Sequence, residues 1–207
     1  MDGDMAYVEV YDEPMHPTVL ENEFVRVIKV DCPANESTML HRHSESSFFL
    51  FFKSAKIRNE VMGKDPVEAE LDKGAFYYGD HLREPLIHKI CVADKMLDCM
   101  DIEIKAGRPR PSSPREPLRS TANREMCFEN EVLRAYQIKV AAGERIYGVE
   151  EGATLTRPCL VVAMSASTFT RGAVSVGDRW WVDGVSEDGS ETNVGDHQAE
   201  IYLLEPK

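Results

Sequence analysis

A repeat of strand-like segments constrains the fold more than any other feature of the sequence. Three blocks recur in the same order: residues 21–26 with 129–134, residues 35–36 with 143–144, and residues 74–78 with 177–181. The second block holds Asn or Gly, the residues that most readily adopt a positive φ in turns. Chance similarity between strands would not preserve this order, so the sequence predicts a duplicated β domain.

The segments between the predicted turns have the composition of β-strands. Residues 24–30 and 201–204 are rich in valine, isoleucine or leucine, and residues 48–52 form an apolar run typical of a buried strand. Clusters of Gly, Asp and Pro interrupt these segments at short intervals, and no long segment has clean helical periodicity. The sequence therefore predicts an all-β sandwich or barrel rather than βαβ units.

A proline-rich stretch at residues 105–124 separates the two copies. It holds four prolines and is basic, in a chain whose net charge is −12. Proline fixes φ and removes a hydrogen-bond donor, so this stretch is predicted to be a linker rather than a strand. We therefore expect an N-terminal barrel at residues 1–104 and a C-terminal barrel at residues 125–207.

The charge balance narrows the range of partners. The chain has 36 acidic and 24 basic residues, and an acidic surface repels phosphate backbones and anionic lipids. Nucleic acid and membranes are therefore not expected as partners, whereas a small-molecule substrate is, and a homodimer remains open. Residues 1–5 lack the basic and apolar regions of a secretory signal, and the five cysteines form no CxxC pair, so we expect a cytoplasmic protein with reduced thiols.

Two histidines separated by one residue are the strongest chemical signal. In a strand, side chains alternate between faces, so His41 and His43 share a face and can present two imidazoles to one metal ion. A third ligand must come from a neighbouring strand, and His88 follows a turn further along the chain. The alternative is that these three, out of the six histidines in the chain, are unrelated residues on the surface.

These segments resemble the two motifs of the cupin superfamily. Asn35 with His41 and His43 is similar to the first motif, G-x5-H-x-H-x3,4-E-x6-G, and Gly79 with Pro85 and then His88 is similar to the second, G-x5-P-x-G-x2-H-x3-N. The resemblance implies two tandem cupin-type double-stranded β-barrels (a bicupin), with a metal held by these three histidines inside one barrel. Val149 and Glu151 stand where the second copy would need its histidine pair, so the second barrel is expected to be degenerate and metal-free.

The first motif departs from the cupin pattern at its glutamate. That position falls on Ser47 or Phe48, and neither can replace a carboxylate ligand. One interpretation is a site of three histidines alone. The other is that Glu45, which has the parity of the two histidines along a continuous strand, supplies a fourth ligand. Spacing decides which atoms reach a metal, so we favour the three-histidine site.

Side chains next to the metal ligands are further candidates. His81 lies seven residues before His88 and is a candidate base beside the metal. Tyr78 is a second candidate, which could point its hydroxyl toward the metal. Alternation in a strand allows only one of Tyr77 and Tyr78 to point a hydroxyl inward.

Three neutral imidazoles leave a metal ion with its full charge and several open coordination positions. Such a centre binds a bidentate anionic substrate together with dioxygen, and it also polarises carbonyls or activates water. By the cupin resemblance, the leading hypothesis is an Fe(II) dioxygenase acting on a small molecule. A lyase or isomerase that uses Zn, Mn or Ni is the second hypothesis, and a non-catalytic ligand-binding or structural bicupin is the third.

Overall fold

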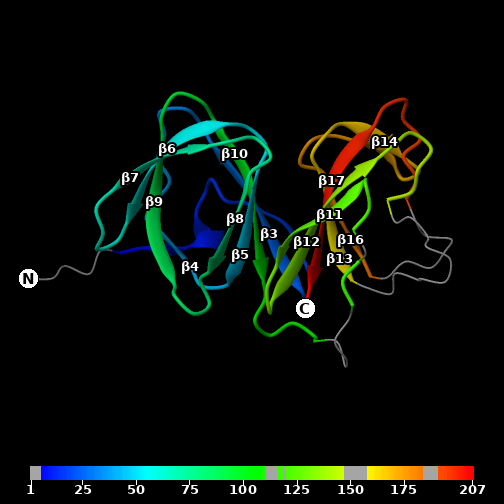
Figure 1. The fold of residues 1–207 in the computed structure, drawn as a ribbon. Coiled ribbons are helices and arrows are strands. Elements are labelled where there is room, and N and C mark those ends of the chain that lie inside the picture. The colour runs from blue at the N-terminus through cyan, green and yellow to red at the C-terminus, as the bar shows by residue number, and fades with distance from the viewer. Residues whose placement is uncertain (1–5, 111–115, 119, 147–157, 184–190) are drawn as a thin grey trace, which may run out of the picture. The chain divides into compact units, whose positions relative to one another are not determined.

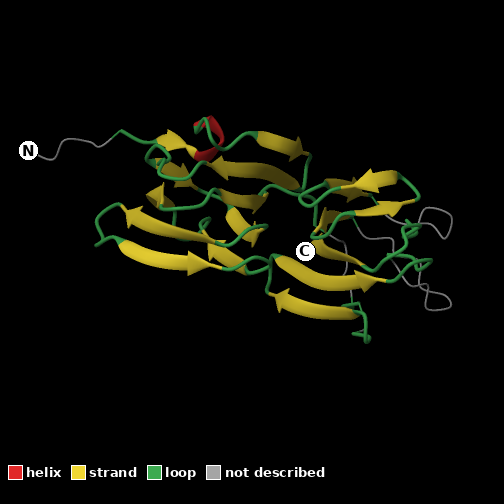
Figure 2. Cartoon of the chain, turned by 90° about the horizontal axis from the view of Figure 1, so that it is seen from above, coloured by secondary structure: helices red, strands yellow, loops and turns green. Residues whose placement is uncertain are grey.

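The computed structural model describes residues 6–110, 116–118, 120–146, 158–183 and 191–207. The chain divides into two compact units, Met1–Pro109 and Arg110–Lys207, and the division falls within the segment predicted to be the linker. Strands make up nearly all of the regular structure, as Figures 1 and 2 show, so the all-β prediction is confirmed. Among the described residues, no helix has the length and apolar character that a membrane crossing requires.

The first unit consists of two five-stranded sheets, with strand orders β1-β4-β9-β6-β7 and β2-β3-β10-β5-β8. Its elements are β1 (Val8–Glu9), the 3-10 helix η1 (Val10–Asp12), β2 (Thr18–Glu21), β3 (Val25–Cys32), β4 (His41–His43), β5 (Ser46–Phe51), β6 (Ala55–Val61), β7 (Val67–Leu71), β8 (Phe76–Asp80), β9 (Leu86–Val92) and β10 (Leu97–Ile104). All pairs are antiparallel except β1 with β4, which run parallel.

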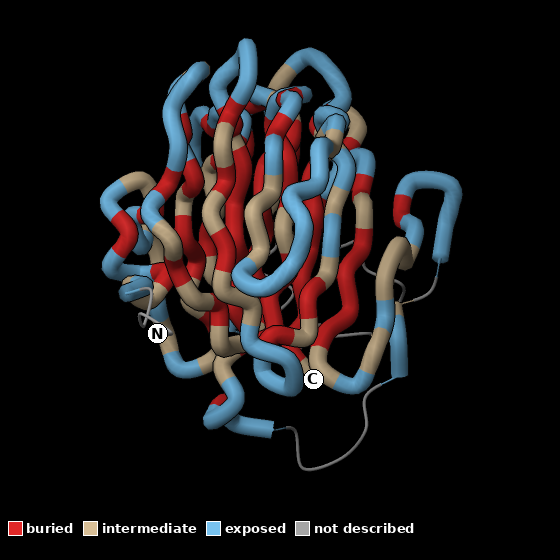
Figure 3. Tube along the Cα trace, turned by 90° about the vertical axis from the view of Figure 1, so that its left-hand side faces the viewer, coloured by how far each residue is buried: buried red, intermediate tan, exposed pale blue. Residues whose placement is uncertain are grey.

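Side-chain alternation divides the inside of the first unit into an apolar half and a polar half. On β9, Ile90 belongs to the apolar core and His88 lies on the same face, nearer the start of the strand. On β10, Cys99 belongs to that core, and Asp101 and Glu103 follow on the same face. The polar residues are as buried as the apolar ones, and Figure 3 shows buried segments (red) along the strands. The strands therefore bring the polar side chains together inside the unit.

The second unit repeats the second sheet of the first unit. Its five-stranded sheet has the order β11-β12-β17-β13-β16, and a two-stranded sheet pairs β14 with β15. Its elements are β11 (Arg124–Glu129), β12 (Leu133–Val140), β13 (Cys159–Ala163), β14 (Ser167–Phe169), β15 (Gly172–Val174), β16 (Arg179–Val182) and β17 (Ala199–Pro206). Each strand of this sheet has its counterpart, in the same position and order, in the sheet β2-β3-β10-β5-β8.

The turns predicted from the repeat also correspond in conformation. Asn35 and Gly143 have φ of 64° and 80°, and Gly74 and Gly177 have φ of 82° and 84°. Asn35 is the one non-glycine residue with positive φ among those described, which Asn tolerates better than most residues because its side chain hydrogen-bonds locally. Equal sheet orders and equal turn conformations confirm that the sequence repeat is a structural duplication.

Candidate metal centre

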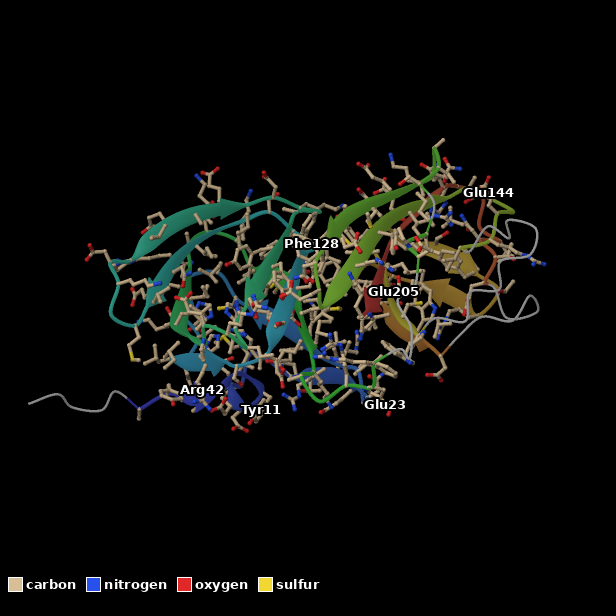
Figure 4. All side chains as sticks on the ribbon, turned by 60° about the horizontal axis from the view of Figure 1, so that its bottom comes forward. Tyr11, Glu23, Arg42, Phe128, Glu144 and Glu205 are labelled. Atoms are coloured by element: carbon tan, nitrogen blue, oxygen red, sulfur yellow. The ribbon has the colours of Figure 1, made fainter. Side chains whose placement is uncertain are left out.

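The three predicted ligands come together on two paired strands. β4 and β9 are antiparallel, and His41 lies directly opposite His88 in their register. His43 follows two residues later on the same face of β4. One ring nitrogen from each of the three histidines lies within 4.8 Å of the others, and all three side chains are buried. The intervening Arg42 points away from them and pairs with Glu9 of β1; Figure 4 shows Arg42 beside the N-terminal segment.

Hydrogen bonds on the outer ring nitrogens direct the inner nitrogens toward one another. Nδ1 of His41 lies 2.9 Å from the carbonyl oxygen of Met39, and Nδ1 of His88 lies 2.9 Å from Oδ1 of Asn59. Both oxygens accept hydrogen bonds, so each Nδ1 carries the proton and each Nε2 carries a lone pair. Nε2 of His88 lies 3.1 Å from Nε2 of the third histidine, His43. Such an approach requires a proton or a cation between them.

Burial keeps the imidazoles of His41 and His88 neutral. Burial, followed by the neighbouring His43 and His16, lowers the pKa of His41 to about 3. Burial, with His43 and His41, also holds the pKa of His88 well below its usual value. Nε2 of His41 is buried and has no hydrogen-bond partner among the described residues. Neutral imidazole with a free lone pair is the form that binds a transition metal.

The ring spacings agree with three imidazoles on one ion. The ring centroids of His41, His43 and His88 are 4.6 to 5.0 Å apart. A metal–nitrogen bond of about 2.1 Å places a ring centre roughly 3.2 Å from the ion, so rings at angles of about 90–110° lie roughly 4.5–5.2 Å apart. The donor set of three imidazoles suits zinc, iron, copper and nickel. The residues present therefore fit a divalent transition metal.

Two buried carboxylates on β10, which sequence reasoning missed, lie beside this group. Oδ2 of Asp101 is 3.1 Å from Nδ1 of His43, although the angles there do not make a hydrogen bond, and neither oxygen of Asp101 has a partner among the described residues. Glu103 lies on the same face and contacts the guanidinium of Arg26 at 3.0 Å. Burial and the charge of Asp101 raise the pKa of Glu103 to about 8. The sequence does hold a signal for this pair: Asp101 and Glu103 are two residues apart in an otherwise mostly apolar strand.

Glu45 does not join the group of possible ligands. It lies in the bend between β4 and β5, where the alternation of a continuous strand is lost. Its Oε2 accepts a hydrogen bond of 2.9 Å from the backbone N–H of Ala106. Ser47, at the position of the cupin glutamate, is buried directly opposite Glu103. The carboxylate beside His43 therefore comes from Asp101 of β10 rather than from the motif itself.

Of the two candidate residues beside the ligands, only His81 lies next to them. Its ring centroid is 5.4 Å from that of His43, and its Nε2 is buried without a partner among the described residues. Tyr78 is the cross-strand partner of Phe48, and Tyr77 is the partner of Phe49, whose ring lies 5.6 Å from that of His43. Side chains alternate along β8, so Tyr78 lies on the face opposite to that of Tyr77 and points away from the histidines.

A fourth histidine, which the sequence did not single out, also reaches this region. His16 follows η1 and is 3% exposed, and its ring centroid lies 4.7 Å from that of His41. Nδ1 of His16 is hydrogen-bonded to Oε2 of Glu13. No sequence pattern links this N-terminal segment to the HxH motif, because the contact depends on how the chain packs.

The second unit has a different interior. Val149 and Glu151 lie outside the described residues, so the structure does not place them. His197 is exposed and its Nε2 lies 2.8 Å from the carbonyl oxygen of Ala166. Apolar and aromatic side chains, among them Tyr136 and Phe169, fill the core. Among the residues described from 110 onward, no His, Cys, Asp or Glu side chains have the spacing of a metal site.

The sequence matches no family model and no curated protein, whereas the structure resembles many solved ones. A salicylate 1,2-dioxygenase mutant from Pseudoaminobacter salicylatoxidans, in complex with gentisate, is 11% identical with a TM-score of 0.60, over 98% of this chain and 77% of that one. A mutant of oxalate decarboxylase from Bacillus subtilis is 11% identical with a TM-score of 0.58, over 92% and 71% of the two chains.

A third similar structure is a cupin 2 conserved barrel domain protein from Leptotrichia buccalis. It is 10% identical with a TM-score of 0.57, over 93% of this chain and 88% of that one. Identities this low establish the fold and nothing further. The likeness extends across both units of the chain, and the prediction of tandem cupin-type barrels is thereby confirmed: this protein has the cupin fold.

Proposed function

We propose that the first barrel binds a divalent transition metal through His41, His43 and His88, and that the protein is a metal-dependent enzyme acting on a small molecule. The observation that carries this proposal is the arrangement of the ring nitrogens. The outer nitrogens of His41 and His88 are held by Met39 and Asn59, and the inner ones converge in a buried space. Hydrogen bonds that fix the ring and its tautomer in this way are typical of metal-ligating histidines.

Within this proposal, the favoured activity is that of an Fe(II) dioxygenase. A bound Fe(II) would supply open coordination positions for dioxygen and for a bidentate anionic substrate. The likeness to a salicylate dioxygenase supports this choice at the level of the fold. The ring of Phe49 lies 5.6 Å from that of His43, where an apolar side chain would help to exclude water.

His81 is suited to contact the substrate. Burial, followed by the neighbouring His43, lowers its pKa, so the ring is neutral near pH 7. It makes a hydrogen bond with the backbone of Glu84, and its Nε2 remains free inside the barrel. A hydroxyl group of a substrate would find a hydrogen-bond acceptor at this atom.

A metal-assisted lyase or isomerase is the second candidate, and the Asp101–Glu103 pair favours it. The pKa of Glu103, raised to about 8 by burial and by Asp101, lets this side chain hold a proton near neutral pH. A buried carboxyl group that keeps its proton can act as a general acid close to the metal. Zn, Mn or Ni would serve this chemistry as well as iron.

The cellular setting is part of the same proposal. None of the five cysteines, all of which lie among the described residues, takes part in a disulfide: Cys32, Cys91, Cys99, Cys127 and Cys159. Free thiols are typical of reducing compartments, and we propose a cytoplasmic location on this basis. The proposed partner is a small-molecule substrate, with neither nucleic acid nor a membrane involved.

Metal content and oxygen uptake together test the proposal. The purified protein is analysed for metals, then stripped and loaded anaerobically with Fe(II), Zn(II), Mn(II) or Ni(II). Stoichiometric iron, and binding of nitric oxide to the Fe(II) form seen by electron paramagnetic resonance, would support the dioxygenase. Tight binding of Zn, Mn or Ni without any reaction of the iron form with oxygen would support the lyase or isomerase. A protein that retains none of these metals would instead be a ligand-binding or structural bicupin.

A further inference from the structure

The buried carboxylate beside His43 has no hydrogen-bond partner. Asp101 on β10 is 0% exposed, and neither of its oxygens is bonded to another of the described residues. Nδ1 of His43 lies 3.1 Å from Oδ2 of Asp101 and is likewise buried without a hydrogen-bond partner there. A buried carboxylate is unfavourable unless a cation or a hydrogen-bond donor compensates for it. The space between Asp101 and His43 is therefore suited to a bound cation.

Glu103 brings a second carboxylate to the same place. It lies two residues after Asp101 on the same face of β10 and is 1% exposed. Arg26 contacts Glu103 through one oxygen, Oε2, at 3.0 Å and so fixes the side chain. Directly opposite Glu103 stands Ser47, which is shorter than the glutamate of the cupin motif and whose Oγ donates to the carbonyl oxygen of Glu45. The side chain of Ser47 therefore does not satisfy the two carboxylates.

The side chains of His43, Asp101 and Glu103 have the spacing of a metal site of their own. One ligand atom from each lies within 4.8 Å of the other two, and all three residues are buried. This group shares only His43 with the three-histidine group. The ring of His43 has one nitrogen for each group, because its Nε2 is 3.1 Å from Nε2 of His88 and its Nδ1 faces Asp101.

We propose that His43, Asp101 and Glu103 form a second divalent cation site beside the three-histidine centre, with His43 shared between the two. One imidazole and two carboxylates suit Mn(II), Fe(II) or Zn(II). When both sites are filled, each ring nitrogen of His43 binds one ion and the ring carries no proton. A cation here would also displace the proton that Glu103 holds in the metal-free protein. The inference rests on the three-histidine centre proposed above, to which the shared ring belongs.

The first test counts the ions bound by each chain. The full-length protein is stripped and equilibrated with Zn(II) in a chelator buffer, and the retained zinc is measured by mass spectrometry. We expect two ions in the wild type and one in Asp101→Asn, which keeps the shape of the side chain and removes its charge. Asp98→Asn is the matched control and should keep two ions, because Asp98 lies on the opposite face of β10 and pairs with Lys53 at 2.8 Å.

The second test asks whether the two ions share a ligand. The protein is loaded with Cu(II) and its electron paramagnetic resonance signal is recorded at low temperature. Two Cu(II) ions joined through the ring of His43 are magnetically coupled, so the wild type should give a weaker signal than two isolated ions. Asp101→Asn should give the full signal of one isolated ion.

The outcomes separate this inference from the proposed function. One ion per chain in the wild type, two ions without magnetic coupling, or two ions in Asp101→Asn would overturn the shared site and leave the three-histidine centre standing. Failure of the wild type to bind any ion would overturn both. The count and the coupling in the wild type need no variant, so the inference remains testable even if Asp101→Asn does not fold.

Discussion

His41 and His88 face each other across the antiparallel pair β4 and β9, with ring centroids 4.6 Å apart. His41 is the first histidine of the HxH pair, and His88 lies 47 positions further along the chain. Strand pairing, rather than proximity in sequence, therefore builds the centre. Because both rings are neutral and held by hydrogen bonds on their outer nitrogens, little rearrangement is needed when a metal binds.

The first prediction concerns removal of a ligand. His41→Ala, His43→Ala and His88→Ala should each weaken Zn(II) binding by at least about 100-fold, because each removes one inner-sphere nitrogen. Thermal unfolding of the metal-free proteins should show that each variant folds, because the apolar core lies at the other end of the strands. Competition titration with a chromophoric chelator measures the affinity. Wild-type affinity in any two of the three variants would contradict the proposed centre.

The second prediction concerns Asn59, which orients a ligand without touching the metal. Oδ1 of Asn59 accepts the hydrogen bond from Nδ1 of His88, so Asn59→Ala should lower Zn(II) affinity about 10- to 100-fold. Asn59→Asp keeps an acceptor oxygen and should restore most of the affinity. Glu45→Gln is the control, since Glu45 bonds the backbone of Ala106 and should not affect affinity. Equal losses in the Ala and Asp variants would point to packing rather than to orientation of the ring.

The third prediction concerns the pH dependence of stability. The pKa of Glu103 is raised from 4.5 to about 8 by burial and by Asp101, so between these values the folded protein holds a proton that the unfolded chain has lost. Stability contributed by this proton is complete below pH 4.5 and is lost as the pH rises toward 8. Urea midpoints of the metal-free protein should therefore fall over this interval, and Glu103→Gln should flatten the decline. An unchanged slope in the variant would mean that Glu103 is ionised throughout.

Local pattern and repeat were enough to predict the architecture. Turn residues at Asn35 and Gly143 require a backbone conformation that few residues adopt, and the strands between such turns follow a period of two. The same local rule placed His41 and His43 on one face, and the cupin resemblance supplied His88. These features were predictable because they depend on neighbours in sequence or on a motif of fixed spacing.

Features that depend on packing between distant segments were not predictable. Glu45 has the parity of the histidines, but a bend before β5 redirects it. His16 reaches His41 only because the N-terminal segment packs beside β4, where β1 pairs in parallel. Asp101 and Glu103 look like ordinary polar residues of a strand until its inward face is known. The alternation of side chains along a strand defines two faces but does not show which face points into the barrel.

The last prediction concerns the position of His81, which depends on a glycine. A Cβ added at Gly79 would lie 2.2 Å from Nε2 of His81, so Gly79→Ala should push the imidazole out of its place beside His43. His81 makes no contribution to the group of three ligands, so Zn(II) affinity should change less than about threefold while turnover of any identified substrate falls at least tenfold, the range typical of a lost acid–base group or contact. His81→Ala should reproduce this separation of metal binding from activity. Gly107→Ala, where an added Cβ meets nothing within 4 Å, is the matched control. Loss of metal affinity in Gly79→Ala, or activity equal to wild type, would show that the close approach of Gly79 and His81 has no part in substrate chemistry.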